Sequence, residues 1–176
     1  TSCGGMYNTS PNGDMKPKKS GTNADLFSLT YGNNTWIASG LNKAIIKSTD
    51  NGETWTKKNI GTNGFCRSAV YSNNTWVAVG DYGAIIKSTD DGETWTKKNS
   101  GTNETINSIV YANNTWIAVG YNGAILKSTD DGETWTKLDS GTKDRLNGIA
   151  TDGMTFVAVG SKGTILSSTD AVQWKE

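Results

Sequence analysis

The feature that most constrains this chain is an internal repeat of forty residues. The stretch Ala-Ile-(Ile/Leu)-Lys-Ser-Thr-Asp-(Asn/Asp)-Gly-Glu-Thr-Trp-Thr-Lys occurs three times, and a shortened fourth copy lies near residue 176. In register, the blocks are 21–60, 61–100, 101–140 and 141–176. A period of this size predicts an array of supersecondary units, each of which needs its neighbours to bury its apolar face.

The composition favours many short strands joined by tight turns. Only 34% of the 176 residues are apolar, while Gly is frequent at 21 and Pro is rare at 2. Seven Trp residues supply buried area that aliphatic side chains would supply elsewhere. The 17 basic and 17 acidic side chains balance. The composition therefore shows no excess of basic residues of the kind that a nucleic-acid-binding face requires, and no nucleic-acid partner is predicted. No apolar run reaches the roughly 18 residues of a membrane helix, which predicts no membrane span.

Alternation of apolar and polar residues with period two predicts four strands in each block. In the second block we expect them at about 67–71, 76–79, 84–88 and 94–98. Asn73-Asn74 predicts a hairpin turn of the primed type, and Asp152-Gly153 predicts the same turn in the fourth block. Four antiparallel strands in forty residues describe one blade of a β-propeller, so the predicted fold class is all-β.

The segment that follows each third strand resembles a known motif. Residues 88–95, Ser-Thr-Asp-Asp-Gly-Glu-Thr-Trp, are similar to the Asp-box, Ser-x-Asp-x-Gly-x-x-Trp, of BNR-repeat propellers, and 48–55 and 128–135 match it equally. The fourth copy, 168–174, keeps Ser, Asp and Trp but is one residue shorter and lacks the Gly. The chain also resembles the propellers of sialidases, of photosystem II assembly factors and of secreted bacterial proteins.

The chemistry of the box predicts a structural role. Asp90 can accept hydrogen bonds from turn amides, Ser88 can tie the other side, and Gly92 can take the left-handed conformation. The adjacent acids Asp90 and Asp91 lack the spaced oxygen ligands of a calcium loop, so we predict no metal and no cofactor. The structural Asp-box positions are Ser48, Asp50, Gly52, Trp55, Ser88, Asp90, Gly92, Trp95, Ser128, Asp130, Gly132, Trp135, Ser168, Asp170 and Trp174.

The ends of the array leave the closure of the ring open. Residues 6–19 align with 46–59, so residues 1–20 are interpreted as a degenerate half-blade or cap before four repeats. We expect a four-bladed ring, with five blades as the next choice. An open arc would expose the surfaces between blades, so pairing of two chains through the array ends is a further hypothesis.

The copies differ from one another in two connections, between the second and third strands and between blades. In an antiparallel blade both connections emerge at the same end, where a rigid scaffold usually carries binding groups. The alternative is neutral drift in solvent-exposed loops. The predicted ligand-binding residues are Lys43, Tyr82, Tyr121, Asn122 and Lys162.

Catalysis is not predicted. A sialidase-like site needs three arginines, and the chain contains only Arg67 and Arg145. With no His, Ser-His and Cys-His nucleophiles are excluded, and nothing marks a pair of acids as a glycosidase site. The predicted function is a non-enzymatic binding or scaffolding module with a protein or glycan partner. A carbohydrate-binding lectin and a consensus-like or designed repeat array remain as alternatives.

Localisation is predicted from the first residues. Thr1-Ser2-Cys3-Gly4-Gly5 resembles the end of a bacterial lipoprotein signal, which implies an extracytoplasmic protein, secreted or lipid-anchored through Cys3. A disulfide between Cys3 and Cys66 and two unrelated thiols are the alternatives. Cys66 aligns with apolar residues in the other blocks, and we expect it to fill a core position. Those residues are Leu26, Ile106 and Leu146.

Overall fold

The computed structural model describes residues 17–60 and 65–176, which fold into four antiparallel sheets. The first sheet contains β1 (Leu26–Gly32), β2 (Thr35–Gly40), β3 (Ile45–Ser48) and β4 (Thr56–Lys58). The second contains β5 (Cys66–Ser72), β6 (Thr75–Gly80), β7 (Ile85–Ser88) and β8 (Thr96–Lys98). The third contains β9 (Ile106–Ala112), β10 (Thr115–Gly120), β11 (Ile125–Ser128) and β12 (Thr136–Leu138). The fourth contains β13 (Leu146–Thr151), β14 (Phe156–Gly160) and β15 (Ile165–Ser168). The all-β prediction with antiparallel blades is confirmed.

Within each sheet the strands pair in chain order, as the blade prediction requires. Short 3-10 turns join the second and third strands of the last three sheets: η1 (Asp81–Gly83), η2 (Tyr121–Gly123) and η3 (Ser161–Gly163). A residue on the fourth-strand side of the last sheet, Lys175, pairs with Ser167 through an isolated bridge. No helix in the described part of the chain has the length and apolar character needed to cross a membrane.

The first-to-second-strand hairpins follow the prediction in the second block but not in the fourth. Asn73 and Asn74 have φ of 48° and 56°, as a type I′ turn requires. The prediction that Asp152-Gly153 forms the same turn is wrong, because only Gly153 has a positive φ. The Asp152 carboxylate instead accepts hydrogen bonds from the amides of Met154 and Thr155, at 2.8 and 2.7 Å. The side chain thus takes over the turn-forming role.

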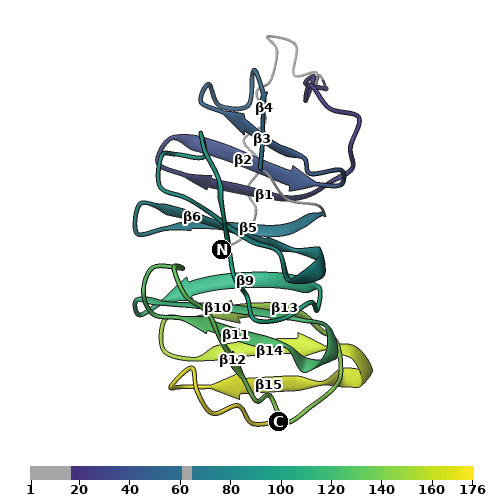
Figure 1. The fold of residues 1–176 in the computed structure, drawn as a ribbon, viewed down its shortest axis with the longest axis vertical. Coiled ribbons are helices and arrows are strands. Elements are labelled where there is room, and N and C mark those ends of the chain that lie inside the picture. The colour runs from purple at the N-terminus through teal and green to yellow at the C-terminus, as the bar shows by residue number, and fades with distance from the viewer. Residues whose placement is uncertain (1–16, 61–64) are drawn as a thin grey trace, which may run out of the picture.

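In Figure 1 the first sheet lies at one end of the long axis, the second follows it, and the third and fourth overlap toward the other end. The first strand of each sheet packs beside the first strand of the next, β1 beside β5, β5 beside β9, and β9 beside β13. The first and fourth sheets lie at opposite ends of the molecule, so the described residues form an open arc and not the expected closed four-bladed ring. Four sheets separated by layers of Trp and Ile side chains turn through less than a full circle.

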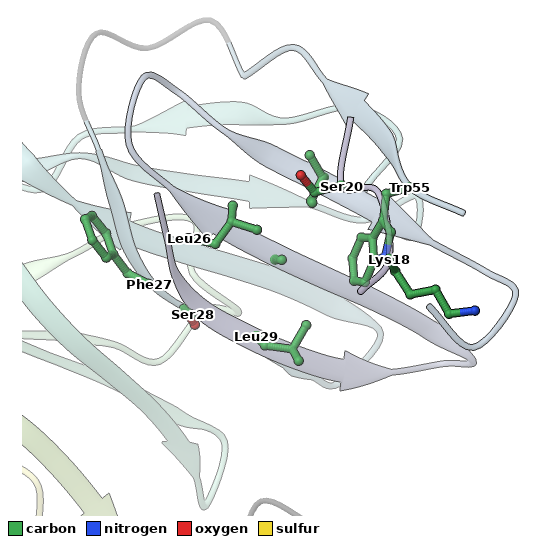
Figure 2. A pocket seen from close by; sticks show the side chains of 9 residues that line it. Lys18, Ser20, Leu26, Phe27, Ser28, Leu29 and Trp55 are labelled. Atoms are coloured by element: carbon green, nitrogen blue, oxygen red, sulfur yellow. The ribbon is translucent and has the colours of Figure 1, made fainter. Parts of the chain in front are cut away.

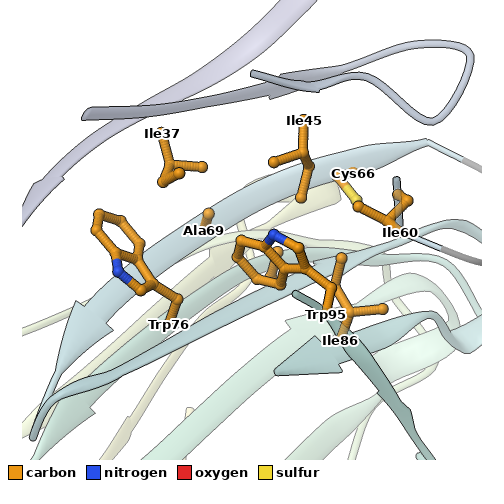
Figure 3. Close-up of a cluster of buried hydrophobic side chains, with 9 residues drawn as sticks. Ile37, Ile45, Ile60, Cys66, Ala69, Trp76, Ile86 and Trp95 are labelled. Atoms are coloured by element: carbon orange, nitrogen blue, oxygen red, sulfur yellow. The ribbon is translucent and has the colours of Figure 1, made fainter. Parts of the chain in front are cut away.

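Each gap between neighbouring sheets is filled by a cluster of apolar side chains. We call the face that a sheet turns toward the next sheet in the chain its forward face, and the face toward the preceding sheet its backward face. The forward face, formed by residues of the second and third strands, meets the backward face of the next sheet. Between the first and second sheets, Ile37 and Ile45 of the forward face contact Ala69, Trp76 and Ile86 of the backward face (Figure 3). Equivalent residues fill the two following gaps. Each large side chain buried in this way contributes about 1.5–3 kcal/mol relative to exposure.

The turn after each third strand is held by its own side chains. In the first sheet the Ser48 hydroxyl donates to the Asp50 carboxylate at 2.8 Å and accepts from the Gly52 amide at 2.9 Å. Asp50 also accepts from the Thr54 amide at 2.9 Å, and the Trp55 indole donates to the Gly52 carbonyl at 3.0 Å. The same hydrogen bonds recur in residues 88–95 and 128–135.

In the fourth copy Ala171, at φ 54°, occupies the left-handed position that Asn51, Asp91 and Asp131 take in the others. It is nevertheless buried among the side chains of the last cluster. The shorter turn is still anchored, because Asp170 accepts from the Val172 and Gln173 amides at 2.8 Å each. Loss of the Gly and one residue therefore alters the loop without removing its carboxylate anchor.

Ion pairs repeat between neighbouring sheets. Glu93 bridges Lys47 at 2.7 Å and Lys58 at 2.6 Å, and Glu133 bridges Lys87 and Lys98 at 2.8 and 2.6 Å. These bonds hold the pKa of each glutamate below its ordinary value, chiefly through the hydrogen bond from Lys47 or Lys87.

The N-terminal segment repeats this ion pair. Lys18 pairs with Glu53 at 2.5 Å, and Lys18 precedes Lys58 by forty residues. Lys18 thus contacts the first sheet as the fourth strand of a preceding blade would. The interpretation of residues 1–20 as a half-blade or cap stays a prediction, because residues 1–16 lie outside the described part of the chain.

We predict that stability falls in acid as the Asp-box carboxylates become protonated. Hydrogen bonds from the Thr54 and Thr134 side chains lower the pKa of Asp50 and Asp130 from 3.8 to about 2. A lowered folded-state pKa stabilises the fold above pH 3.8, and this contribution is lost as pH falls toward 2. The urea midpoint should be flat from pH 7 to about 5 and should drop below about 4. In Asp130→Asn the urea midpoint should be lower at pH 7 and should decrease less between about pH 5 and about pH 2 than in the wild type. An equal decrease in both proteins would show that the Asp130 carboxylate does not contribute to the loss of stability in acid.

We also predict that the native Cys66 thiol resists alkylation. It is a free thiol that is 2% exposed, and burial, with a smaller effect of Asp81, raises its pKa to about 12. Its block equivalents Ile106 and Leu146 are fully buried, which confirms a core position. Iodoacetamide at pH 8 followed by mass spectrometry should leave the Cys66 peptide unmodified in native protein and modify it in urea. Rapid native modification would show that the first interface opens.

Candidate binding rim

The connections between second and third strands lie at the same end of the sheets as the connections between blades. Backbone hydrogen bonds join them at corresponding places in all four sheets: Leu41 N to Asp25 O (2.8 Å), Asp81 N to Phe65 O (3.0 Å), Tyr121 N to Thr105 O (2.8 Å) and Ser161 N to Arg145 O (2.8 Å). We call this end, formed by residues 41–43, 81–83, 121–123 and 161–163 with the neighbouring blade connections, the rim.

The rim turns hold non-glycine residues in the left-handed conformation. Asn42, Tyr82, Asn122 and Lys162 have φ between 52° and 56°, and Lys43 follows with φ 60° where the other turns have Gly. Such a conformation costs an ordinary residue about 1–2 kcal/mol. Residues kept in costly conformations gather at functional sites, which makes these turns candidates for binding.

Contacts to the next blade connection fix the turns. Gly83 N donates to Glu104 O and Gly123 N donates to Asp144 O, both at 2.9 Å. A Cβ at Gly83 would lie 2.0 Å from the Thr102 carbonyl oxygen. The backbone of this turn is therefore packed directly against the following connection, and its exposed side chain stands on a rigid base.

The third and fourth sheets form the most connected part of the rim. The Arg145 guanidinium lies over the Tyr121 ring, 4.5 Å from its centroid. Asn122 donates to Glu104 at 3.3 Å, and Lys162 pairs with Asp144 at 2.7 Å. That ion pair, with a smaller contribution from a Thr164 hydrogen bond, lowers the pKa of the Asp144 carboxyl.

The predicted site residues are thereby distributed over four sheets. Tyr82 is 74% exposed on the second sheet, and Lys43 is exposed on the first. In the same turn as Tyr82, the buried Asp81 pairs with Arg67 at 2.6 Å. Sequence reasoning did not include Arg145 in the site, although it is one of only two arginines and lies in a variable connection.

A recess of about 460 Å³ adjoins the rim on the third sheet. Its lining combines turn η2 with the residues that lead from β12 to the fourth sheet, namely Asn122, Gly123, Lys137, Leu138, Asp139, Ser140, Thr142 and Lys143. The lining mixes cationic, amide and hydroxyl groups with the Leu138 side chain, so it suits a polar chain segment more than an apolar small molecule.

No group of three or more His, Cys, Asp or Glu side chains able to hold a metal ion occurs in residues 17–60 and 65–176. The adjacent acids that invite a metal interpretation are engaged elsewhere. Asp131 accepts hydrogen bonds from Thr75 at 2.7 Å and from Asn73 at 3.4 Å, both on the preceding sheet. This acid therefore connects two blades.

We predict that Gly83→Ala destabilises the protein more than Gly163→Ala. Both residues have a positive φ, at 66° and 79°, so both variants carry the cost of a left-handed alanine. Only at Gly83 does the new Cβ meet the Thr102 carbonyl; around Gly163 nothing lies within 4 Å. Thermal unfolding should give a lower Tm for Gly83→Ala. Equal Tm values would show that the rim turn is not held against the next connection.

Comparison with known proteins agrees with this architecture. The model of the BNR/Asp-box repeat family matches residues 46–57. No curated protein matches the chain. Among solved structures, YCF48 from Cyanidioschyzon merolae superposes with a TM-score of 0.70 at 19% identity, over 88% of this chain and 56% of that one. An ancestral GH74 enzyme superposes with a TM-score of 0.74 at 18% identity, over 90% of this chain and 24% of that one.

A second YCF48 structure, bound to a D1 peptide, gives a TM-score of 0.65 at 17% identity, over 87% of this chain and 52% of that one. The chain therefore spans about half the length of the YCF48 structures. Identities below 20% support a shared fold, and the shared activity of any one neighbour does not follow from them. Together with the hydrogen-bonded turns, these matches show that the chain carries the BNR/Asp-box repeat on blades with the fold of BNR-type β-propellers.

Proposed function

We propose that this protein is a non-catalytic binding or scaffolding module that receives an extended polar segment of another protein at its rim. The observation that carries the proposal is the pairing of rigid turn backbones with side chains that differ from blade to blade. Tyr82, Asn122 and Lys162 stand at equivalent positions with nearly the same φ, yet they offer an aromatic ring, an amide and an ammonium group. Such a surface can distinguish successive residues of a peptide.

The strongest contact point is the pair of Arg145 and Tyr121. A guanidinium stacked on a ring keeps N–H donors for a carboxylate, and stacking limits the rotamer entropy lost on binding. Aromatic and arginine side chains also dominate the energetics of most protein interfaces. We therefore expect the bound segment to place a carboxylate near Arg145 and an apolar or aromatic side chain near Tyr82.

The YCF48 structure bound to a D1 peptide supports a protein partner, because it shows a propeller of related fold in a peptide complex. The same comparison includes a GH74 enzyme, so the fold is compatible with catalysis as well. A glycosidase needs an acid with a raised pKa. In the described residues, every carboxyl group with a clear pKa shift is shifted downward.

A lectin function is the second candidate, and the aromatic residues restrict where it could reside. Trp76 and Trp116 are fully buried, so these repeated tryptophans offer no stacking face to a sugar. Tyr82 and Tyr121 remain as rim aromatics. Action outside the cytoplasm, with Cys3 as a lipid anchor, stays a proposal that rests on residues 1–5, which lie outside the described part of the chain.

The test is selection from a displayed library of random twelve-residue peptides, followed by fluorescence anisotropy with the best peptide. Tyr121→Ala and Arg145→Ala should each weaken binding about tenfold or more, because each removes half of the stacked pair. Met154→Ala is the matched control, since Met154 is 77% exposed on a hairpin at the opposite end of the sheets.

Equal affinities of the rim variants and the control would place the binding site elsewhere. Failure to select any peptide, together with a glycan-array signal that Tyr82→Ala and Tyr121→Ala abolish, would replace the peptide proposal with the lectin one. Circular dichroism of each variant separates loss of binding from loss of fold.

A further inference from the structure

The first and fourth sheets each have an exposed apolar face. The equivalent faces of the other sheets are buried between neighbouring sheets. On the forward face of the fourth sheet, Val157, Val159 and Ile165 are 38%, 45% and 56% exposed. The residues forty and eighty positions earlier are fully buried in the third and second internal interfaces, respectively. They are Val77, Val79, Ile85, Ile117, Val119 and Ile125. Among residues 17–60 and 65–176, no sheet packs against the forward face of the fourth sheet.

The backward face of the first sheet is the counterpart of that surface. Leu26 and Leu29 are 40% and 57% exposed, whereas their equivalents Cys66 and Ala69 are 2% and 4% exposed. A recess of about 380 Å³ opens here, bordered by Leu26, Leu29 and Trp55 (Figure 2).

The lining of this recess corresponds position by position to a filled interface. Five of its residues precede by forty the residues Cys66, Ala69, Ala78, Ile86 and Trp95: they are Leu26, Leu29, Ala38, Ile46 and Trp55. Ala38 and Ile46 are already buried in the single chain, so the exposed apolar part of this face is formed by Leu26 and Leu29. The five later residues all lie in the cluster between the first and second sheets. There the opposing side chains include Ile37 and Ile45, whose equivalents in the fourth sheet are the exposed Val157 and Ile165.

The polar border of the recess is likewise prepared for a preceding blade. Lys18 already forms with Glu53 the ion pair that Lys58 forms with Glu93 across the first interface. Lys18 thus stands where the fourth strand of a preceding blade would place its lysine. Within the described part of the chain, β15 pairs on its outer side only at Ser167, which leaves its edge near Ile165 without a partner strand there.

We propose that the forward face of the fourth sheet of one copy docks on the backward face of the first sheet of a second copy. The occupant is a second copy because the chain itself carries both halves of the interface. In Figure 1 the first and fourth sheets lie at opposite ends of the molecule, so the two faces of one copy are not packed against each other. In the proposed dimer a twofold rotation brings both pairs of faces together and closes one larger ring.

In this arrangement residues 17–20 of each copy lie beside β15 of its partner. Val157 and Ile165 fill the recess next to Leu29 and Trp55, as Ile37 and Ile45 fill the first internal gap. The dimer contains two identical contacts, and each contact joins the forward face of one copy to the backward face of the other. It uses none of the rim side chains, so it stands independently of the proposed peptide binding.

Light scattering coupled to gel filtration tests the proposal with the 176-residue chain. The expected mass is twice 18.8 kDa at micromolar concentration. Val159→Lys on the forward face and Leu29→Lys on the backward face should each give a mass of 18.8 kDa. Tyr82→Lys, on an exposed residue of the second sheet, is the matched control and should stay at the doubled mass.

Mixing the two end-face variants identifies which surfaces meet. Val159→Lys retains an intact backward face and Leu29→Lys an intact forward face, so the mixture should recover a doubled mass through one remaining contact. A wild-type chain that stays at 18.8 kDa overturns the proposal. So does an end-face variant that still pairs with itself, because that result requires like faces to meet. Ile165→Lys replaces Val159→Lys if circular dichroism shows that the latter does not fold.

Discussion

The apolar contact between successive sheets is the interaction on which the rest of this structure depends. A blade of forty residues has two faces, and neither can be buried within the blade. Trp76 shows the consequence, because its side chain lies on the second sheet and is buried by Ile37 of the first. The stability of one blade is therefore a property of the pair, as in other repeat arrays.

The Asp-box turns make that contact reproducible. The hydrogen bonds among Ser48, Asp50 and Gly52 fix the loop, and the indole of Trp55 is tied to the same loop by its N–H. Between sheets, Gly92 approaches Ile37 so closely that a Cβ would lie 2.8 Å from its Cδ1. The turn thus serves as a spacer, which sets how near the next sheet can come, and its carboxylates are committed to this task.

Much of this architecture could be predicted from the repeat, because strand alternation and turn chemistry are local. The strands of the second block and the Asn73-Asn74 turn are of that kind. The Asp152-Gly153 turn was predicted wrongly because a side-chain hydrogen bond from Met154 N and Thr155 N outweighed the backbone preference of the dipeptide. The open arc and the stacking of Arg145 on Tyr121 depend on angles and distances between blocks, which no single block encodes. Sequence could place the variable connections at one end of the sheets but could not bring Arg145 and Tyr121 together.

The repetition of the same contacts between sheets every forty residues has a consequence for how such a chain changes over time. Since each interface joins one block to the equivalent positions of the next, a whole block can be gained or lost without creating a new kind of contact. A single substitution on a sheet face, by contrast, must fit a neighbour that has not changed. The number of blocks is therefore easier to change than the residues on a sheet face. Positions with mostly exposed side chains, such as Tyr82, can diversify alone.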